Sequence, residues 1–275
     1  MVTVRRALSW FLGPAGLVPA ARIPQALFAL LLATVASGCA SVDRGLYDAS
    51  SSAAPPHPVT GKPVFNIVSE EDEIATAQKV RERVAEAAAS EGIPFDANSP
   101  RFDELNSVFE RITSVAHRQH LPWEVHLIGD PTVNAFTAGG GVVFVHDGLY
   151  GGLVYEGDVD ELAAVMAHEV AHVTLLHASE RRTWQGVVGI ATKKVRDPYF
   201  NASFTTEQEA EADKLAALYM ALAGYDPLAA SRVWARAHSR SGSDAGAGWF
   251  LNSHPVDLAR MAATEKHGRA VRQFF

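Results

Sequence analysis

The chain has 275 residues, of which 48% are hydrophobic, so it can bury a sizeable core and is not globally disordered. Its 24 Lys and Arg against 31 Asp and Glu give a formal charge of -7 with no concentrated basic block, which argues against a nucleic-acid partner. The one cysteine, Cys39, excludes an internal disulfide framework and a Cys-rich zinc module. Any metal ion must therefore be held by His, Asp or Glu side chains.

The N-terminal segment is typical of a bacterial export signal. Three arginines precede an apolar run at 26–36, which is too short to cross a bilayer comfortably, because a spanning helix needs about 20 apolar residues. The run ends in Ala-Ser-Gly-Cys at 36–39, which resembles the lipobox of bacterial lipoproteins, whose cysteine is lipidated and becomes the first mature residue. The alternative is an incidental Cys39 beside an ordinary cleavage site.

These features divide the chain into a lipoprotein signal peptide at 1–38, a flexible tether at 39–63 that is rich in Ser and Pro, and a folded domain at 64–275. Removing 1–38 leaves 21 basic and 31 acidic side chains, a formal charge of -10. Ala rather than Asp follows Cys39, which by the same resemblance favours the outer membrane of a Gram-negative cell. We expect a lipid on Cys39 to hold the domain on the periplasmic side of that membrane.

The domain reads as α+β, mainly helical with a small β-sheet. Apolar residues at helical spacing predict helices that begin after Ser69 and at Ser99-Pro100. Apolar alternation at 123–127 and short apolar runs at 134–136 and 142–145 predict three strands. The helical pattern returns from 158 to about 177, and further helices are predicted at 206–223, from 226 to about 238, and after 255.

A His-Glu-Val-Ala-His stretch at 168–172 carries the most chemical information. His168 and His172 lie four residues apart, on one helical face, and can bind a single Zn²⁺. Glu169 is placed to accept a proton from a water whose pKa the zinc lowers to about 7. The alternative is a solvated polar face on an ordinary helix. Apolar residues on nearly every side of this helix argue against it.

The third ligand must come from elsewhere in the chain. Four carboxylates crowd into the stretch that contains Glu207, Glu209 and Glu211, and a bound dication would relieve their repulsion. We prefer Glu209, because Asp213, one helical turn later, can then hydrogen-bond the second nitrogen of a zinc-bound His. The competing interpretation pairs Glu209 with Thr206 in a capping box.

Together these motifs resemble the gluzincin peptidase family that includes the CAAX prenyl proteases, the HtpX-type membrane proteases and the periplasmic proteases of outer-membrane assembly. The resemblance points to the periplasmic branch in a lipoprotein form, and it covers about 69–267. It implies a zincin-type fold with one Zn²⁺ per chain, held by His168, His172 and Glu209, and Glu169 as catalytic base. The motifs that carry it are Val133–Phe136, Gly148-Leu149, Glu161–Val165, His168–His172, Glu209–Asp213, and Ser253-His254-Pro255 with Arg260.

The same resemblance implies a substrate-binding edge and two further site residues. The strand with Asn134, Ala135 and Phe136 would be an active-site edge to which an extended substrate adds as a strand. His254 would either donate to the oxyanion or occupy the zinc and hold the enzyme latent, the plain alternative being a histidine at a helix entry. Arg260 would bind a substrate carbonyl or pair with the acidic surface.

The sequence therefore predicts that 64–275 is a zinc endopeptidase domain that cuts unfolded or misassembled envelope proteins. The alternative is a chaperone or assembly lipoprotein that holds extended strands in the same groove without hydrolysing them. A third possibility is a structural lipoprotein with a relict metal site. The complete set of His168, Glu169 and His172 argues against both alternatives, because binding alone needs no general base.

Overall fold

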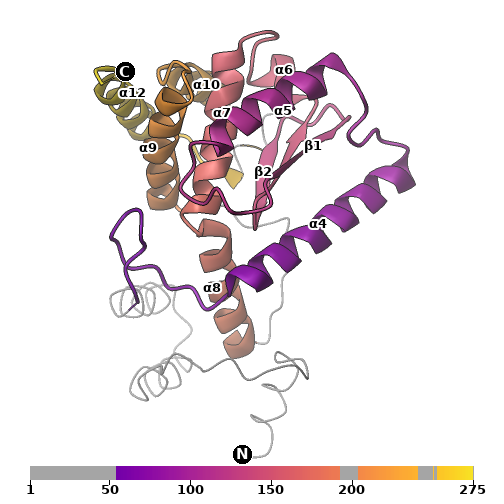
Figure 1. Cartoon of the computed structure of the whole chain (residues 1–275), viewed down its shortest axis with the longest axis vertical. Coiled ribbons are helices and arrows are strands. Elements are labelled where there is room, and N and C mark those ends of the chain that lie inside the picture. The colour runs from indigo at the N-terminus through magenta and orange to yellow at the C-terminus, as the bar shows by residue number, and fades with distance from the viewer. Residues whose placement is uncertain (1–53, 193–203, 241–249, 251–252, 275) are drawn as a thin grey trace, which may run out of the picture. The chain divides into compact units, whose positions relative to one another are not determined.

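The computed structural model describes residues 54–192, 204–240, 250 and 253–274 (Figure 1). The predicted signal peptide, Cys39 and the tether up to residue 53 lie outside these residues. The compact unit begins at Ala54, so the last ten residues of the predicted tether belong to the domain. There Pro56 pairs with Pro63, and His57 is only 4% exposed. Within the described part of the chain, no helix combines the length and apolarity that crossing a membrane requires.

Two predicted helices open the domain and begin where their caps indicated. α4 (Glu70–Glu91) starts at Ser69, whose side chain accepts a hydrogen bond from the backbone N–H of Asp72. α5 (Pro100–Thr113) starts at Ser99, which caps the N–H of Phe102. A serine cap satisfies one of the N–H groups that a helix leaves unpaired in its first turn. Both boundaries are confirmed.

The three predicted strands form one small mixed sheet. β1 (Glu124–Ile128) pairs in parallel with β3 (Val142–His146), and β2 (Ala135–Gly139) pairs antiparallel with β3, which gives the order β1-β3-β2. β2 is therefore an edge strand. The tight β2–β3 turn needs glycine at 140, where φ is +57° and a Cβ would meet the Glu73 backbone oxygen at 2.8 Å.

Both faces of the sheet are buried, against different helices. Val142 and Phe144 pack with apolar residues of α4. Val143 and Val145, which point the other way, pack into the main core with α5 and α7 (Val159–Thr174). Figure 1 shows α7 passing beside the sheet, with α9 (Thr206–Leu222) and α10 (Ala229–Ser239) on its other side. α7 is thus the central element of the domain.

Further helices in the described residues are α6 (Leu149–Gly152), α8 (His177–Thr192) and α12 (Leu258–Arg272). The prediction of a single helix from 158 to about 177 is wrong at its C-terminal end. α7 ends at Thr174, Leu176 takes a left-handed φ of +62°, and α8 begins at His177. The predicted α+β class, mainly helical with a small sheet, is confirmed.

Candidate metal centre

α7 places three of the predicted site residues in the middle of the core. The helix starts at Asp158, whose carboxylate caps the N–H of Glu161. The helix is buried from Glu161 to Thr174, and His168, Glu169 and His172 are each 0% exposed. Polar side chains buried this deeply require strong partners. The other helices supply them.

α9 brings the third predicted ligand into the core. Its capping box is formed by Thr205 and Gln208, with Gln208 N–H donating to Thr205 Oγ1 at 3.2 Å and Thr205 N–H donating to Gln208 Oε1 at 3.1 Å. The interpretation that paired Glu209 with Thr206 is therefore wrong, because the box lies one residue earlier. Glu209 takes no part in the capping box, and it is 0% exposed.

The ligand atoms of the two helices converge. His172 Nε2 lies 3.0 Å from His168 Nε2 and 3.3 Å from Glu209 Oε1, and His168 Nε2 lies 3.4 Å from Glu209 Oε2. The alternatives do not reach this point: Glu207 is exposed, and Glu211 is 26% exposed and faces His177. The geometry therefore supports Glu209 as the carboxylate of the cluster.

His254 joins the same cluster from the far end of the chain. Its Nδ1 lies 3.0 Å from Glu209 Oε1 and 3.2 Å from His168 Nε2, while its Nε2 lies 3.4 Å from Glu169 Oε1. The ring is fully buried and stacks on Phe250, with centroids 4.8 Å apart. His254 is thus more than a helix-entry residue: it contacts the ligand set and Glu169 together.

Arg260 and Asp213 contact the ligand residues His168 and Glu209. Asp213 Oδ1 lies 2.9 Å from His168 Nδ1, a contact through which it can orient the ring. Arg260 donates through Nε and Nη2 to the two Asp213 oxygens at 2.7 and 3.0 Å, and its Nη1 lies 2.5 Å from Glu209 Oε2. Arg260 is 3% exposed, and its carboxylate partners are the buried Glu209 and Asp213 rather than the acidic surface.

The buried groups of the cluster shift one another's pKa values. Burial opposes charge on His168, but Glu209 and Asp213 outweigh it and raise the pKa of His168 to about 9. Burial, together with the charge on His168, holds the pKa of His172 well below its usual value. Burial also opposes ionisation of Glu209, yet His254 and Arg260 hold the pKa of that carboxyl well below its usual range. The site therefore keeps ionised carboxylates beside clustered imidazoles.

This donor set fits a divalent metal ion. One atom from each of His168, His172, Glu209 and His254 can be chosen so that all four lie within 4.8 Å of one another, and all four residues are buried. Imidazole nitrogens with a carboxylate oxygen are ligands that Zn²⁺ and related ions take in proteins. Four donors equal the number of ligands that a zinc site usually provides, counting His254 as the fourth.

Glu169 lies beside the ligands without joining them. Burial raises the pKa of its carboxyl group. In the described part of the chain neither of its oxygens makes a hydrogen bond, and its ion-pair contact is with His254 Nε2. A buried carboxylate with free acceptor positions is chemically suited to take up a proton.

The predicted substrate edge overlaps β2, and this strand packs against α7, the helix that carries His168 and His172. Asn134 precedes β2 and its carbonyl accepts a hydrogen bond from His146, while Ala135 and Phe136 belong to β2. Phe136 stacks on Phe144 of β3 with centroids 4.8 Å apart. A shallow hollow joins this strand to α4 and α8, lined by Val80, Phe136, Thr137, Ala138, Ala178, Arg181 and Arg182.

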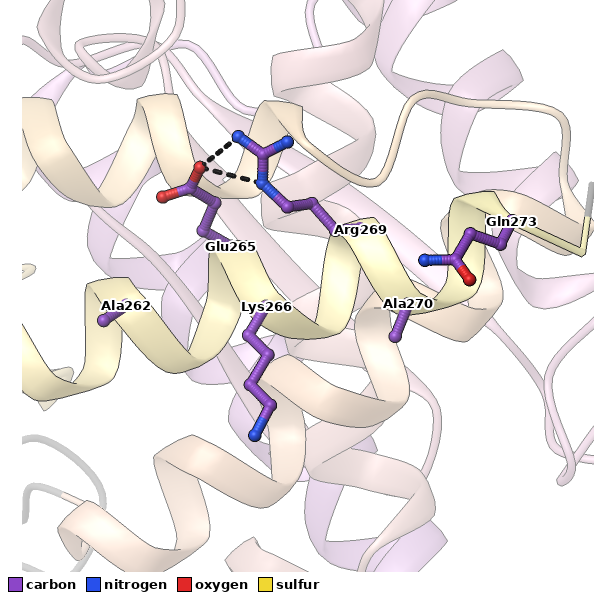
Figure 2. Close-up of a pocket in the computed structure, with 6 residues that line it drawn as sticks. All are labelled: Ala262, Glu265, Lys266, Arg269, Ala270 and Gln273. Carbon is purple, nitrogen blue, oxygen red and sulfur yellow. Dashed lines mark hydrogen bonds and ion pairs between the residues drawn. The ribbon is translucent and has the colours of Figure 1, made fainter.

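A larger hollow of about 450 Å³ lies away from the chemistry, on α12 (Figure 2). Figure 2 shows Glu265 and Arg269 paired with each other on this helix, with Lys266 pointing away from them. None of the ligand residues lines it; its lining is Ala262, Glu265, Lys266, Arg269, Ala270 and Gln273.

Sequence reasoning missed two residues that support the centre. His177 contacts the ligand His172 at 2.9 Å. Glu73 accepts hydrogen bonds from Gly140 N–H and from Arg118, which also donates to the Val173 carbonyl at the end of α7. The spacing of His177 gave no helical signal, and Glu73 is joined to its partners only by the tertiary fold.

Comparisons with known proteins agree with this geometry. The sequence profile of Peptidase family M48 matches residues 99–195 and 190–267. The chain is 31% identical over 223 residues to the mitochondrial metalloendopeptidase OMA1 of Schizosaccharomyces pombe, which covers 76% of this chain and 65% of that protein. It is 26% identical over 192 residues to the beta-barrel assembly-enhancing protease of Escherichia coli K12, covering 61% of this chain and 39% of that protein.

A third relative, the mitochondrial metalloendopeptidase OMA1 of Arabidopsis thaliana, is 30% identical over 159 residues, which cover 54% of this chain and 32% of that protein. The chain thus spans less than two thirds of the length of each of these relatives. The matched region contains His168, His172, Glu209 and His254, the four residues whose ligand atoms converge in the core. The chain belongs to Peptidase family M48.

Proposed function

We propose that this protein is a zinc-dependent endopeptidase of the bacterial cell envelope that hydrolyses peptide bonds in unfolded or misassembled envelope proteins. The observation that carries the proposal is the buried convergence of His168, His172 and Glu209, with Glu169 beside them. A zinc ion bound there would lower the pKa of a water molecule and polarise the scissile carbonyl. The rest of the catalytic work falls to the protein's own side chains.

Glu169 is the proposed general base. Its carboxylate lies in the same helical turn as His168 and is fully buried. Burial raises its pKa, which makes it a stronger base toward the water that gives up the proton. After accepting the proton, the same residue can deliver it to the leaving amine. Peptide hydrolysis requires both transfers, and one carboxyl group can perform them in turn.

β2 is the proposed substrate-binding edge. It pairs with β3 on one side only, so a substrate strand could continue the sheet through backbone hydrogen bonds. Recognition of this kind reads the backbone more than the side chains and selects for extended chain. The expected substrates are therefore unfolded segments rather than a defined sequence.

His254 is the proposed latency element. Its ring contacts Glu209 and His168 through Nδ1 and Glu169 through Nε2, so it fills the space between base and ligands. In this position it completes the ligand set and keeps water from Glu169. An open catalytic site needs that position free, so His254 must move before turnover.

The cellular setting is proposed from the N-terminal sequence and from one relative. The lipobox-like stretch ending at Cys39 supports lipid anchoring on the periplasmic side of the outer membrane. The similarity to a protein named beta-barrel assembly-enhancing protease supports the periplasmic branch of the gluzincin proteases and an envelope substrate class.

A comparison of envelope proteins in cells tests this function. Cells producing Glu169→Gln should accumulate unfolded or misassembled envelope proteins that cells producing the native protein remove, and Glu156→Gln, at an exposed carboxylate, should behave as native. Identical envelope profiles in native and Glu169→Gln cells under folding stress would refute the protease. If the native protein and Glu169→Gln protect cells equally against folding stress, the strand-holding chaperone is favoured.

A further inference from the structure

His177, the first residue of α8, contacts the ligand His172 on the side turned away from the metal centre. The Nδ1 atoms of the two rings are 2.9 Å apart, and the rings meet edge to face with centroids 5.0 Å apart. His172 points its other nitrogen, Nε2, at His168 and Glu209. His177 is 2% exposed, so the contact is protected from water.

The break between α7 and α8 makes this contact possible. On a continuous helix, residues five positions apart lie about 140° apart around the axis, so their side chains would not meet. Leu176 instead takes a φ of +62°, an uncommon conformation for a residue other than glycine. Backbone outliers of this kind persist where the surrounding structure fixes them, and they cluster at functional sites.

The positions of the nitrogens determine where the protons lie. A neutral imidazole that offers Nε2 to a metal ion carries its proton on Nδ1. His172 Nδ1–H therefore donates to His177, whose Nδ1 must accept. His177 then carries its own proton on Nε2, the nitrogen that lies 3.6 Å from Glu211 Oε2. A carboxylate only accepts, so this single arrangement of protons suits all three groups.

Glu211 is itself held in place by the first described segment of the chain. Lys62 forms an ion pair with Glu211 Oε1, the oxygen that does not face His177. In the same segment, the His57 Nε2 lies 3.0 Å from the carbonyl oxygen of Thr174, the last residue of α7. Contacts from 54–63 thus fix both the carboxylate and the helix end between which His177 sits.

The other histidine of the motif has a more direct partner. His168 Nδ1 lies 2.9 Å from Asp213. Metal-binding histidines generally give their second N–H to a carboxylate, carbonyl or water, and loss of that partner weakens metal binding. We propose that His177 is a positioning residue for His172, holding it in the tautomer and orientation that bind zinc, with Glu211 acting through His177. This inference rests on the proposed zinc site.

Zinc affinity of the full-length chain, purified in detergent and measured by chelator competition, tests the inference without relying on activity. His177→Leu keeps side-chain bulk but removes the acceptor, and should weaken zinc binding by about 10- to 100-fold. His177→Asn places an amide oxygen near the position of Nδ1 and should recover most of the affinity. His126→Leu is the matched control, because His126 is a buried histidine of β1 bound to Asp96, and it should bind zinc as the native chain does.

A double-mutant cycle tests the role of Glu211. Glu211→Gln alone should weaken zinc binding by a few-fold, and it should cause no further loss when added to His177→Leu. Additive losses would overturn the relay and leave only general electrostatic attraction by Glu211. Unfolding midpoints of the metal-free variants in denaturant separate loss of the fold from loss of the ligand's partner.

Two outcomes overturn the role of His177 itself. One is a zinc affinity of His177→Leu within about twofold of native, because loss of a histidine's hydrogen-bond partner should weaken zinc binding by at least about tenfold. The other is equal weakening by His177→Leu and His177→Asn, which would reduce His177 to packing. Failure of these variants alone leaves the proposed protease standing. Failure of the native chain to bind zinc removes the proposed function first, and this inference with it.

Discussion

The His254 ring lies 3.4 Å from the carboxylate of Glu169, measured from Nε2 to Oε1. The proposed base and the proposed latency element are therefore in contact, and the same ring also reaches Glu209 and His168. One substitution at His254 separates the two roles that the sequence left open.

If His254 blocks the centre at rest, His254→Ala should speed cleavage of an unfolded fluorogenic protein. The gain should be about tenfold if roughly nine molecules in ten are blocked, because the rate scales with the competent fraction. If His254 stabilises the oxyanion, the same variant should be slower by about 10²-fold. We expect the increase. An unchanged rate, with zinc still bound, would leave His254 with neither role.

Glu169→Gln should keep zinc and lose turnover. The amide retains the size of the side chain but cannot take up a proton, so kcat should fall by roughly 10²-fold or more. Metal analysis and peptide cleavage on the same sample check both parts. Near-native cleavage with full zinc occupancy would assign the base to another residue.

His168→Ala should remove zinc rather than slow chemistry alone. The change leaves too few protein ligands to fix the ion. It also removes the imidazole that contacts Asp213. Elemental analysis after incubation with zinc at neutral pH should find about one ion per native chain and far less in the variant. His120→Ala, at an exposed histidine, is the control.

Acid should weaken the junction between α7 and α10. Glu161 is 1% exposed and accepts two hydrogen bonds from Arg236 at 2.8 and 2.9 Å. Burial alone would raise the pKa of this carboxyl, but Arg236 and the Tyr155 N–H outweigh it and lower the pKa below 4.5. Its stabilisation is therefore fully present above about pH 4.5, the unfolded value, and is lost as the pH falls through the lower folded value.

Glu161→Gln should accordingly lower the free energy of unfolding by about 2–3 kcal/mol at pH 7, the scale for hydrogen bonds to a charged group. The difference from native should shrink as the pH falls below 4, which urea titrations at several pH values can follow. Glu156→Gln, on the exposed partner of Arg101, should cost less than about 1 kcal/mol throughout. A pH-independent difference would mean that packing, not charge, connects the helices.

Cys39→Ser should abolish lipid attachment. Labelled fatty acid should enter the native chain in cells and not the variant, and the native chain should sediment with membranes, because several acyl chains hold a protein stably there. Equal labelling of both chains would return Cys39 to the incidental interpretation.

Local signals located most of the fold. Ser69 and Ser99 marked helix starts that the structure confirms, and the apolar runs gave all three strands. These features are set within a few residues, so a sequence displays them. The end of α7 was missed because Leu176 adopts a left-handed conformation with none of the residues that usually announce it.

The residues of the site likewise fall into those that local sequence patterns identify and those that only the tertiary fold brings together. His168 and His172 were placed by the helical repeat, and the preference for Glu209 followed from Asp213 one turn later. The capping box was shifted by one residue, because Thr205 and Thr206 are adjacent and spacing alone does not distinguish them. The role of His177 could not be read from the chain, since it depends on a helix break and on a carboxylate of another helix.

The early start of the domain also limits where a tethered enzyme could work. A chain spans at most about 3.4 Å per residue, so a linker from Cys39 to residue 64 would reach about 85 Å, whereas one that stops at Ala54 reaches about 50 Å. If Cys39 carries the proposed lipid, the shorter linker would keep the proposed catalytic centre closer to the bilayer than the longer one would. Polypeptides emerging at the membrane surface would be within range, and those drifting through the aqueous space beyond would not.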